Sequence, residues 1–188
     1  MTTRSTLSAE DWIKAAFRAL SVGGVQAIRA EAIARDLNVS KGSFYWHFRD
    51  VAALKSEMLR HWIQRGTNEI IDAVEATGAP PAERLRLLVR EATGDHGSEY
   101  GGEPVEAAIR EWARYDAAAA AVLRSVDARR LAYVAELFGK HGVPANRTDA
   151  CARLLYGALV GLGSLASDEA TERRGDMSHL VGLLLAEA

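Results

Sequence analysis

Apolar residues recur every three or four positions through the first fifty residues, and the repeats fall into three short blocks. This spacing is typical of amphipathic helices that bury one face. The first block follows a capping box, in which Ser8 is the N-cap and Asp11 reaches back to it. Gly23-Gly24 ends this helix, a second helix spans about 29–37 and closes at Asn38, and Ser40 is placed to cap a third. The pattern predicts three short helices, the last two joined by a turn of about three residues.

The remainder of the chain carries longer helical repeats and no convincing strand alternation. A helix that Asp50 can cap runs to about Ala76, where Gly78-Ala79-Pro80-Pro81 breaks it. Further helices are predicted over about 82–93, 105–115, Asp116 to near Gly142, 147–166 and 176–187. We therefore expect an all-α fold of about nine helices. It would consist of a three-helix head over residues 1–50 and a C-terminal helical bundle over 51–188, linked by the long helix 51–76.

The composition is that of a globular protein, with 48% hydrophobic and 26% charged residues in a chain of 188. The net charge of −2 hides an asymmetry, because residues 1–65 carry ten Lys or Arg against six Asp or Glu. A basic head on an acidic body favours an anionic partner for the head alone. The single cysteine, Cys151, fits a reducing compartment and the role of a small buried residue. Without an apolar h-region or an apolar run of 18 residues, we expect a cytoplasmic protein that does not span a membrane.

Residues Val39 to Asp50, which read VSKGSFYWHFRD, concentrate aromatic and basic side chains in one short segment. At about 100° per residue, Phe44 and Phe48 share one helix face while Tyr45 and Trp46 turn elsewhere. One interpretation is an aromatic corner of the core. The other is a helix-turn-helix, which presents its second helix to the DNA major groove. The outward face combined with the tight turn favours DNA binding.

The outward residues carry chemistry that suits DNA. Lys41 can pair with a phosphate or a guanine edge, and Ser43 can bond to a phosphate or a base. The polar tips of Tyr45 and His47 can donate to phosphate oxygens. Gly42 lets the backbone approach closely, and Trp46 can lie against sugars or a thymine methyl group.

This segment, with Ile33-Ala34-Arg35-Asp36-Leu37-Asn38 before it, resembles the N-terminal DNA-binding domain of TetR-type transcriptional repressors over about residues 8–60. The resemblance implies phosphate contacts at the start of the second helix, where this chain has Arg29-Ala30 in place of the usual Ser or Thr. It also implies a basic residue three positions after the Phe, where this chain has Val51 and where Arg49 or Lys55 can serve instead. The residues that we expect to bind DNA are Arg29, Ala30, Ser40, Lys41, Gly42, Ser43, Tyr45, Trp46, His47, Arg49 and Lys55.

The last two predicted helices are apolar on nearly every side and therefore need cover all round. They are either internal core or half of a two-fold four-helix bundle made with a second copy of the chain. TetR-type repressors dimerise through their last two helices, so the resemblance favours a homodimer. The expected interface residues are Leu154, Gly157, Ala158, Gly161, Leu162, Leu165, Leu180 and Leu184.

The residue types that catalyse reactions or bind metal ions do not occur at the spacings that known catalytic motifs and metal sites require. The five His residues never fall at metal-ligand spacing, and no nucleophile elbow or phosphate-binding loop occurs. Asp95-His96, in the glycine-rich stretch 94–104, is the nearest approach to a catalytic pair. We therefore expect no enzyme, cofactor or metal site. The resemblance implies instead a small-molecule pocket in the body, for which the candidates are Trp62, Glu106, Arg110, Trp112, Tyr133 and Tyr156.

These features favour a homodimeric transcriptional regulator. The hypothesis is a repressor that an unidentified small-molecule effector releases from a palindromic operator in double-stranded DNA. Residues 1–50 would bind DNA, and residues 51–188 would bind the effector and form the dimer. A helical interaction module and a small all-helical enzyme, neither of which binds DNA, are the alternative interpretations.

Overall fold

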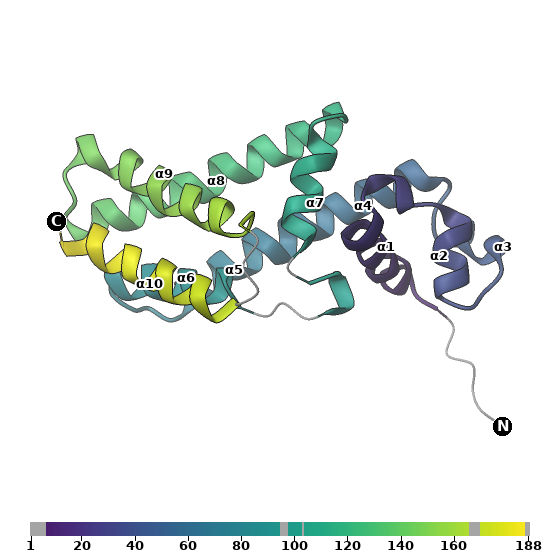
Figure 1. Cartoon of the computed structure of the whole chain (residues 1–188), viewed down its shortest axis with the longest axis horizontal. Helices are drawn as coiled ribbons and strands as arrows, with labels where there is room; N and C mark the ends of the chain where they lie inside the picture. Colours follow the sequence, from purple (N-terminus) through teal and green to yellow (C-terminus); the bar gives the residue numbers. More distant parts are fainter. Residues whose placement is uncertain (1–6, 95–97, 103, 166–169, 187–188) are drawn as a thin grey trace, which may run out of the picture. The chain divides into compact units, whose positions relative to one another are not determined.

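A computed structural model describes residues 7–94, 98–102, 104–165 and 170–186 (Figure 1). In these ranges every regular element is helical. The α-helices are α1 (Ala9–Gly23), α2 (Ala30–Asp36), α3 (Lys41–Phe44), α4 (Val51–Ile63), α5 (Glu69–Ala76), α6 (Pro81–Ala92), α7 (Pro104–Ala113), α8 (Ala117–His141), α9 (Ala145–Leu162) and α10 (Ala170–Ala186). A π-helical segment, Gln64–Asn68, joins α4 to α5 without a gap, so the three form one long helix. The expected all-α fold of about nine helices is confirmed for the described residues.

Side-chain caps explain where α1, α4 and α8 begin, and at α8 the Ala118 and Ala119 N–H groups each donate to Asp116 Oδ1 over 2.9 Å. At α1, the Asp11 N–H donates to Ser8 Oγ over 3.3 Å and the Ser8 N–H donates to the Asp11 carboxylate over 2.8 Å, which completes the capping box. At α4, the Ala53 N–H donates to Asp50 Oδ1 over 2.7 Å. The cap expected at Ser40 is wrong. Ser40 stands at the N-cap position of α3, but its side chain makes no capping bond and its Oγ lies 3.4 Å from Ser43 Oγ instead.

The last two helices begin earlier than the apolar pattern predicts. α9 starts at Ala145, directly after Pro144, because the fixed φ of proline suits the position before a helix. α10 starts at Ala170, six residues before the predicted start, because its first turns are polar and show no apolar repeat. The two predicted helices therefore exist, with their N-terminal ends shifted.

The chain divides into two compact units. The first comprises Met1–Trp62 with Asp95–Leu123, and the second comprises Ile63–Gly94 with Arg124–Ala188. This division reflects packing alone. The division into a DNA-binding head over 1–50 and a ligand-binding and dimerisation body over 51–188 concerns function and stays a prediction.

In the first unit, a short segment distant in sequence packs on α1. This 3₁₀ turn, Ser98–Tyr100, places the Tyr100 ring 6.0 Å from that of Phe17, and the Tyr100 hydroxyl donates to the Glu10 carboxylate. Gly101 follows with φ of 83°, and a Cβ there would lie 2.7 Å from the Phe17 carbonyl oxygen. Only glycine allows so close an approach. Residues around 100 are thus an integral part of the unit that contains the three short helices.

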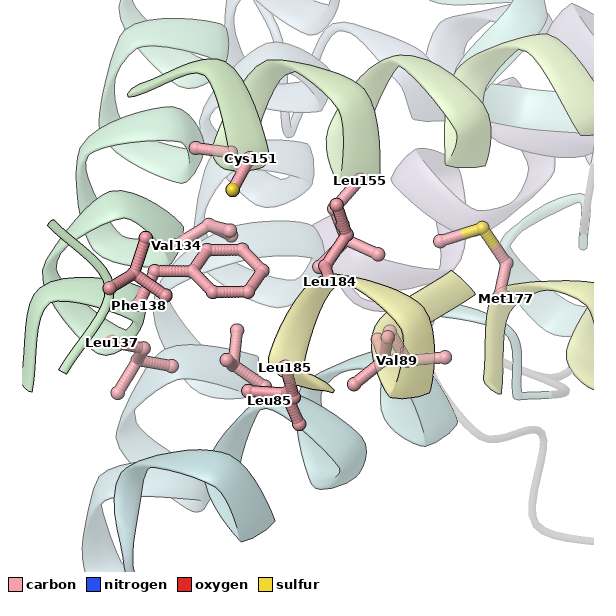
Figure 2. Close-up of a cluster of buried hydrophobic side chains, with 13 residues drawn as sticks. Leu85, Val89, Val134, Leu137, Phe138, Cys151, Leu155, Met177, Leu184 and Leu185 are labelled. Carbon is pink, nitrogen blue, oxygen red and sulfur yellow. The ribbon is translucent and has the colours of Figure 1, made fainter. Parts of the chain in front are cut away.

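The second unit has its own apolar core, formed by α6, the C-terminal half of α8, α9 and α10 (Figure 2). Its centre holds Leu85, Leu137 and Phe138, each 0% exposed. Cys151 is buried there, as its position in an apolar repeat predicts. Leu184, one of the expected dimer-interface residues, is also part of this core and is 8% exposed, so its own chain already covers most of its side chain. An all-round apolar helix packs one side within its own chain, and sequence alone does not reveal which side.

Candidate nucleic-acid interface

An aromatic cluster fixes α3 to the rest of the first unit. The Phe44 side chain is 0% exposed, and its ring meets that of Trp12 edge-on at 5.5 Å and that of Phe48 at 5.6 Å. Phe48 is likewise buried, and its N–H donates to the Phe44 carbonyl over 3.0 Å. The prediction that these two Phe residues share a buried face is therefore confirmed.

A tight turn sets the direction of α3 relative to α2 (Figure 1). Asn38 adopts the left-handed conformation, with φ of 57°, which asparagine tolerates better than most residues. The Val39 N–H then donates to the Ala34 carbonyl over 2.9 Å and closes the end of α2. α2, this turn and α3 form the helix-turn-helix that the sequence predicts.

The recognition segment, which we define as residues 41–47, exposes large aromatic groups. Trp46 is 88% exposed and Tyr45 is 56% exposed, although both flank the buried Phe44 cluster. Lys41, Gly42 and His47 are also exposed, and Ser43 is half-buried. Burial of Trp46 would stabilise the fold, so its exposure marks a surface suited to a partner.

The basic side chains near this segment are not equivalent. The Lys41 ammonium pairs with the Glu31 carboxylate, and this bond raises the pKa of Lys41. Arg49 lies 3.3 Å from the Asp50 carboxylate, and its side chain is 84% exposed. The Lys55 ammonium lies over the Trp112 ring of α7, 5.7 Å from its centroid. Of the two candidates to replace a basic residue at the Val51 position, Arg49 is therefore the better placed.

The start of α2 offers a different kind of contact. Arg29 occupies the N-cap position without a side-chain capping bond, as its residue type predicts, and it is exposed. The Ala30 side chain is 4% exposed, so Ala30 can reach a phosphate through its backbone N–H alone. Free N–H groups at a helix N-terminus are suited to that role.

The six candidate pocket residues fall in different units. Trp62, Glu106, Arg110 and Trp112 belong to the first, and Tyr133 and Tyr156 belong to the second. Arg110 pairs with Glu106 at 2.9 Å, and the Tyr133 hydroxyl donates to Glu75 over 2.8 Å. Open hollows of about 300 and 620 Å³ lie in the first unit, and none of the six residues lines either of them.

A polar cluster in the second unit was missed by the sequence reasoning. Arg130 of α8 donates to the Gly66 carbonyl over 2.8 Å and to Thr67 Oγ1 over 3.0 Å, both in the π-helical segment. It also donates over 3.1 Å to the hydroxyl of Tyr156, which donates in turn to Asp127 over 2.6 Å. Such π-helical segments are rare and often occur at functional sites. Gly66, a glycine inside a long helical repeat, is the one signal of it in the sequence.

The described residues hold neither a candidate metal site nor a candidate membrane-spanning helix. In these ranges no three or more His, Cys, Asp and Glu residues are grouped to hold a metal ion. None of the described helices is both long enough and apolar enough to cross a bilayer. Asp95-His96, the nearest approach to a catalytic pair, lies outside the described residues.

Comparison with known proteins links this geometry to a family. Residues 13–58 match the family model described as bacterial regulatory proteins, tetR family. No curated protein matches the sequence. Many solved structures match the fold, and three of them do so at 18–20% identity, over 93–98% of this chain and 91–96% of theirs. They are a protein from Saccharomonospora viridis assigned as a transcriptional regulator and solved with choline (TM-score 0.78), a TetR-like regulator from Rhodococcus sp. RHA1 (0.76) and a TetR-family regulator from Streptomyces coelicolor (0.76).

Residues 13–58 are therefore a TetR-type helix-turn-helix by sequence, and the chain as a whole has the fold of the TetR-family transcriptional regulators.

Proposed function

We propose that this protein is a homodimeric, DNA-binding repressor that leaves its operator when a small molecule binds. The observation that carries the proposal is the recognition segment. Trp46 and Tyr45 are solvent-exposed beside a fully buried Phe44, on a helix-turn-helix that falls within the matched residues. A core corner would bury these rings, whereas a groove-reading helix needs them outside.

The recognition segment and its surroundings have separate tasks in this proposal. Gly42, Ser43 and Trp46 enter the major groove, where base edges are read. Contacts to the phosphates on either side fix the register, and they come from Arg29, the Ala30 N–H, Ser40, Lys41, Tyr45, His47 and Arg49. Lys55, held over Trp112, contributes to packing within the first unit rather than to DNA.

A second copy of the chain would cover an apolar stripe that runs along α9 and continues to Leu165, three residues beyond its end. Leu154 and Leu165 are 59% and 63% exposed, and Gly157, Ala158 and Gly161 lie between them at helical spacing. A Cβ added at Gly157 or Gly161 would meet no atom within 4 Å, so none of the described residues covers these positions. Leu183 of α10, 53% exposed, joins the interface in place of Leu184, with Leu162 and Leu180 at its edge. Two heads about 34–36 Å apart would then read a palindromic site.

Leu154→Asp should convert the protein to monomers without unfolding it. The side chain is exposed in the single chain, so the charge harms the interface and not the fold. Sedimentation velocity gives the oligomeric state, and affinity for a full palindrome should fall to that for a half-site. Val22→Asp is the matched control, because Val22 is 91% exposed and lies on α1. If the Leu154→Asp variant stays dimeric, α9 is not part of the dimer interface.

Selection of bound sequences from a random DNA pool by the full-length protein tests the whole proposal. We expect one enriched motif with two-fold symmetry and half-sites one helical turn apart, and binding that weakens as salt rises. Choline is the first effector to add to the complex, because a relative of the same fold was solved with it. If no sequence is enriched, the protein is not a sequence-specific DNA-binding regulator. If the enriched motif has no two-fold symmetry, the protein does not bind DNA as a symmetric dimer.

A further inference from the structure

We infer that Glu31 is an internal counterion for Lys41 and sets the strength and salt dependence of DNA binding. This inference rests on the proposed function and names a regulating residue within the same site. It concerns a single contact between the two helices of the helix-turn-helix.

The contact joins residues ten positions apart. Glu31 lies in the first turn of α2, Lys41 is the first residue of α3, and the carboxylate binds the ammonium directly. Their side chains are 58% and 49% exposed, so both are accessible to a partner in solution. The pair lowers the pKa of Glu31 and raises that of Lys41, and each partner therefore keeps its charge in the free protein.

DNA must compete with Glu31 for Lys41. A phosphate that takes the ammonium leaves the Glu31 carboxylate unpaired beside an anionic backbone, which opposes binding. The exchange is possible because exposed ion pairs are weak and screened by salt. Glu31 thus offsets about one of the positive charges that the head presents, and the number of counterions released falls accordingly.

Two other ion pairs of the first unit have structural roles that differ from that of the Glu31–Lys41 pair. Arg18 pairs with Asp36 at 2.6 Å and ties α1 to the end of α2, away from the recognition segment. Asp50, which pairs with Arg49, also caps α4 through the Ala53 N–H, so its removal would disturb a helix. The Glu31–Lys41 pair is the one of these three that occupies a residue of the recognition segment without acting as a helix cap.

The test is a double-mutant cycle with Glu31→Gln, Lys41→Gln and the double variant, measured on the operator selected above at several salt concentrations. We expect Glu31→Gln to tighten binding about 3- to 10-fold and to steepen the log–log salt slope by about 0.9. In the Lys41→Gln background the gain should fall below about twofold, because Glu31 acts through Lys41. Thermal unfolding of each variant separates this effect from stability, since Glu31 also stands at a helix N-terminus.

Glu136→Gln is the matched control. Glu136 pairs with Lys140 on α8, with side-chain exposures of 56% and 50%, so the same charge is lost from a similar pair outside the helix-turn-helix. Its affinity and slope should equal those of the wild type. If Glu136→Gln tightens DNA binding as much as Glu31→Gln does, the effect comes from net charge and the inference is wrong. If Glu31→Gln binds DNA with wild-type affinity and salt slope, the inference is also wrong, but the proposed function stands. Wild-type protein that binds no DNA would instead overturn the proposed function.

Discussion

Replacement of Phe44 by alanine should lower the free energy of unfolding of the first unit by about 3–5 kcal/mol, the usual cost of deleting a buried Phe ring. The side chain is 0% exposed and contacts Trp12, Tyr45 and Phe48 through ring faces and edges. α3 is only four residues long, and an isolated helix of that length is unstable in water. The recognition segment therefore depends on this anchor for its structure.

Denaturant unfolding followed by tryptophan fluorescence gives the measurement, because Trp12 and Trp46 report on the same region. Tyr45→Ala is the control, since Tyr45 is the neighbouring aromatic residue and is 56% exposed. Its effect on stability should stay within about 0.5–1 kcal/mol, as expected for a surface position with one ring contact. Equal losses for the two variants would mean that Phe44 is not the anchor of α3.

Local signals along the chain were sufficient to predict the elements that position the interface. The Ser8 and Asp11 pair, the left-handed Asn38 and the Asp50 cap each depend on residues within five positions of one another, and each is present. The face shared by Phe44 and Phe48 follows from helical spacing in the same way. Where a feature depends on nearby residues, the pattern contains all the partners that determine it.

Features that depend on distant partners could not be predicted in this way. The π-helical segment is bonded to Arg130, more than sixty positions away, and the 3₁₀ turn at Tyr100 packs on α1 across some ninety positions. The position of Lys55 over the Trp112 ring depends on a residue more than fifty positions away. The Glu31–Lys41 contact likewise requires the turn geometry that brings two helices together. The charges of the head were countable from the sequence, but their pairing was not.

Replacement of both Tyr45 and Trp46 by alanine should reduce affinity for the selected operator by about 100-fold or more, to the level of non-specific binding. A hydrogen bond from a Tyr hydroxyl to a charged phosphate contributes about 1.5–3 kcal/mol, and loss of the Trp46 contact adds to this. Each factor of ten in affinity corresponds to about 1.4 kcal/mol. Non-specific binding should persist, because Arg29, Lys41 and Arg49 still supply the positive charge.

Titration of operator and unrelated DNA, followed by fluorescence anisotropy, separates the two effects. Tyr115→Ala is the matched control, because Tyr115 is an aromatic residue 79% exposed in the same unit but outside the helix-turn-helix. It should bind the operator like the wild type. A double variant that still binds the operator at full strength would show that the exposed rings serve another partner, and the interaction module would become the better interpretation. The exposure of Trp46 would then mark a protein-binding surface rather than a DNA-reading one.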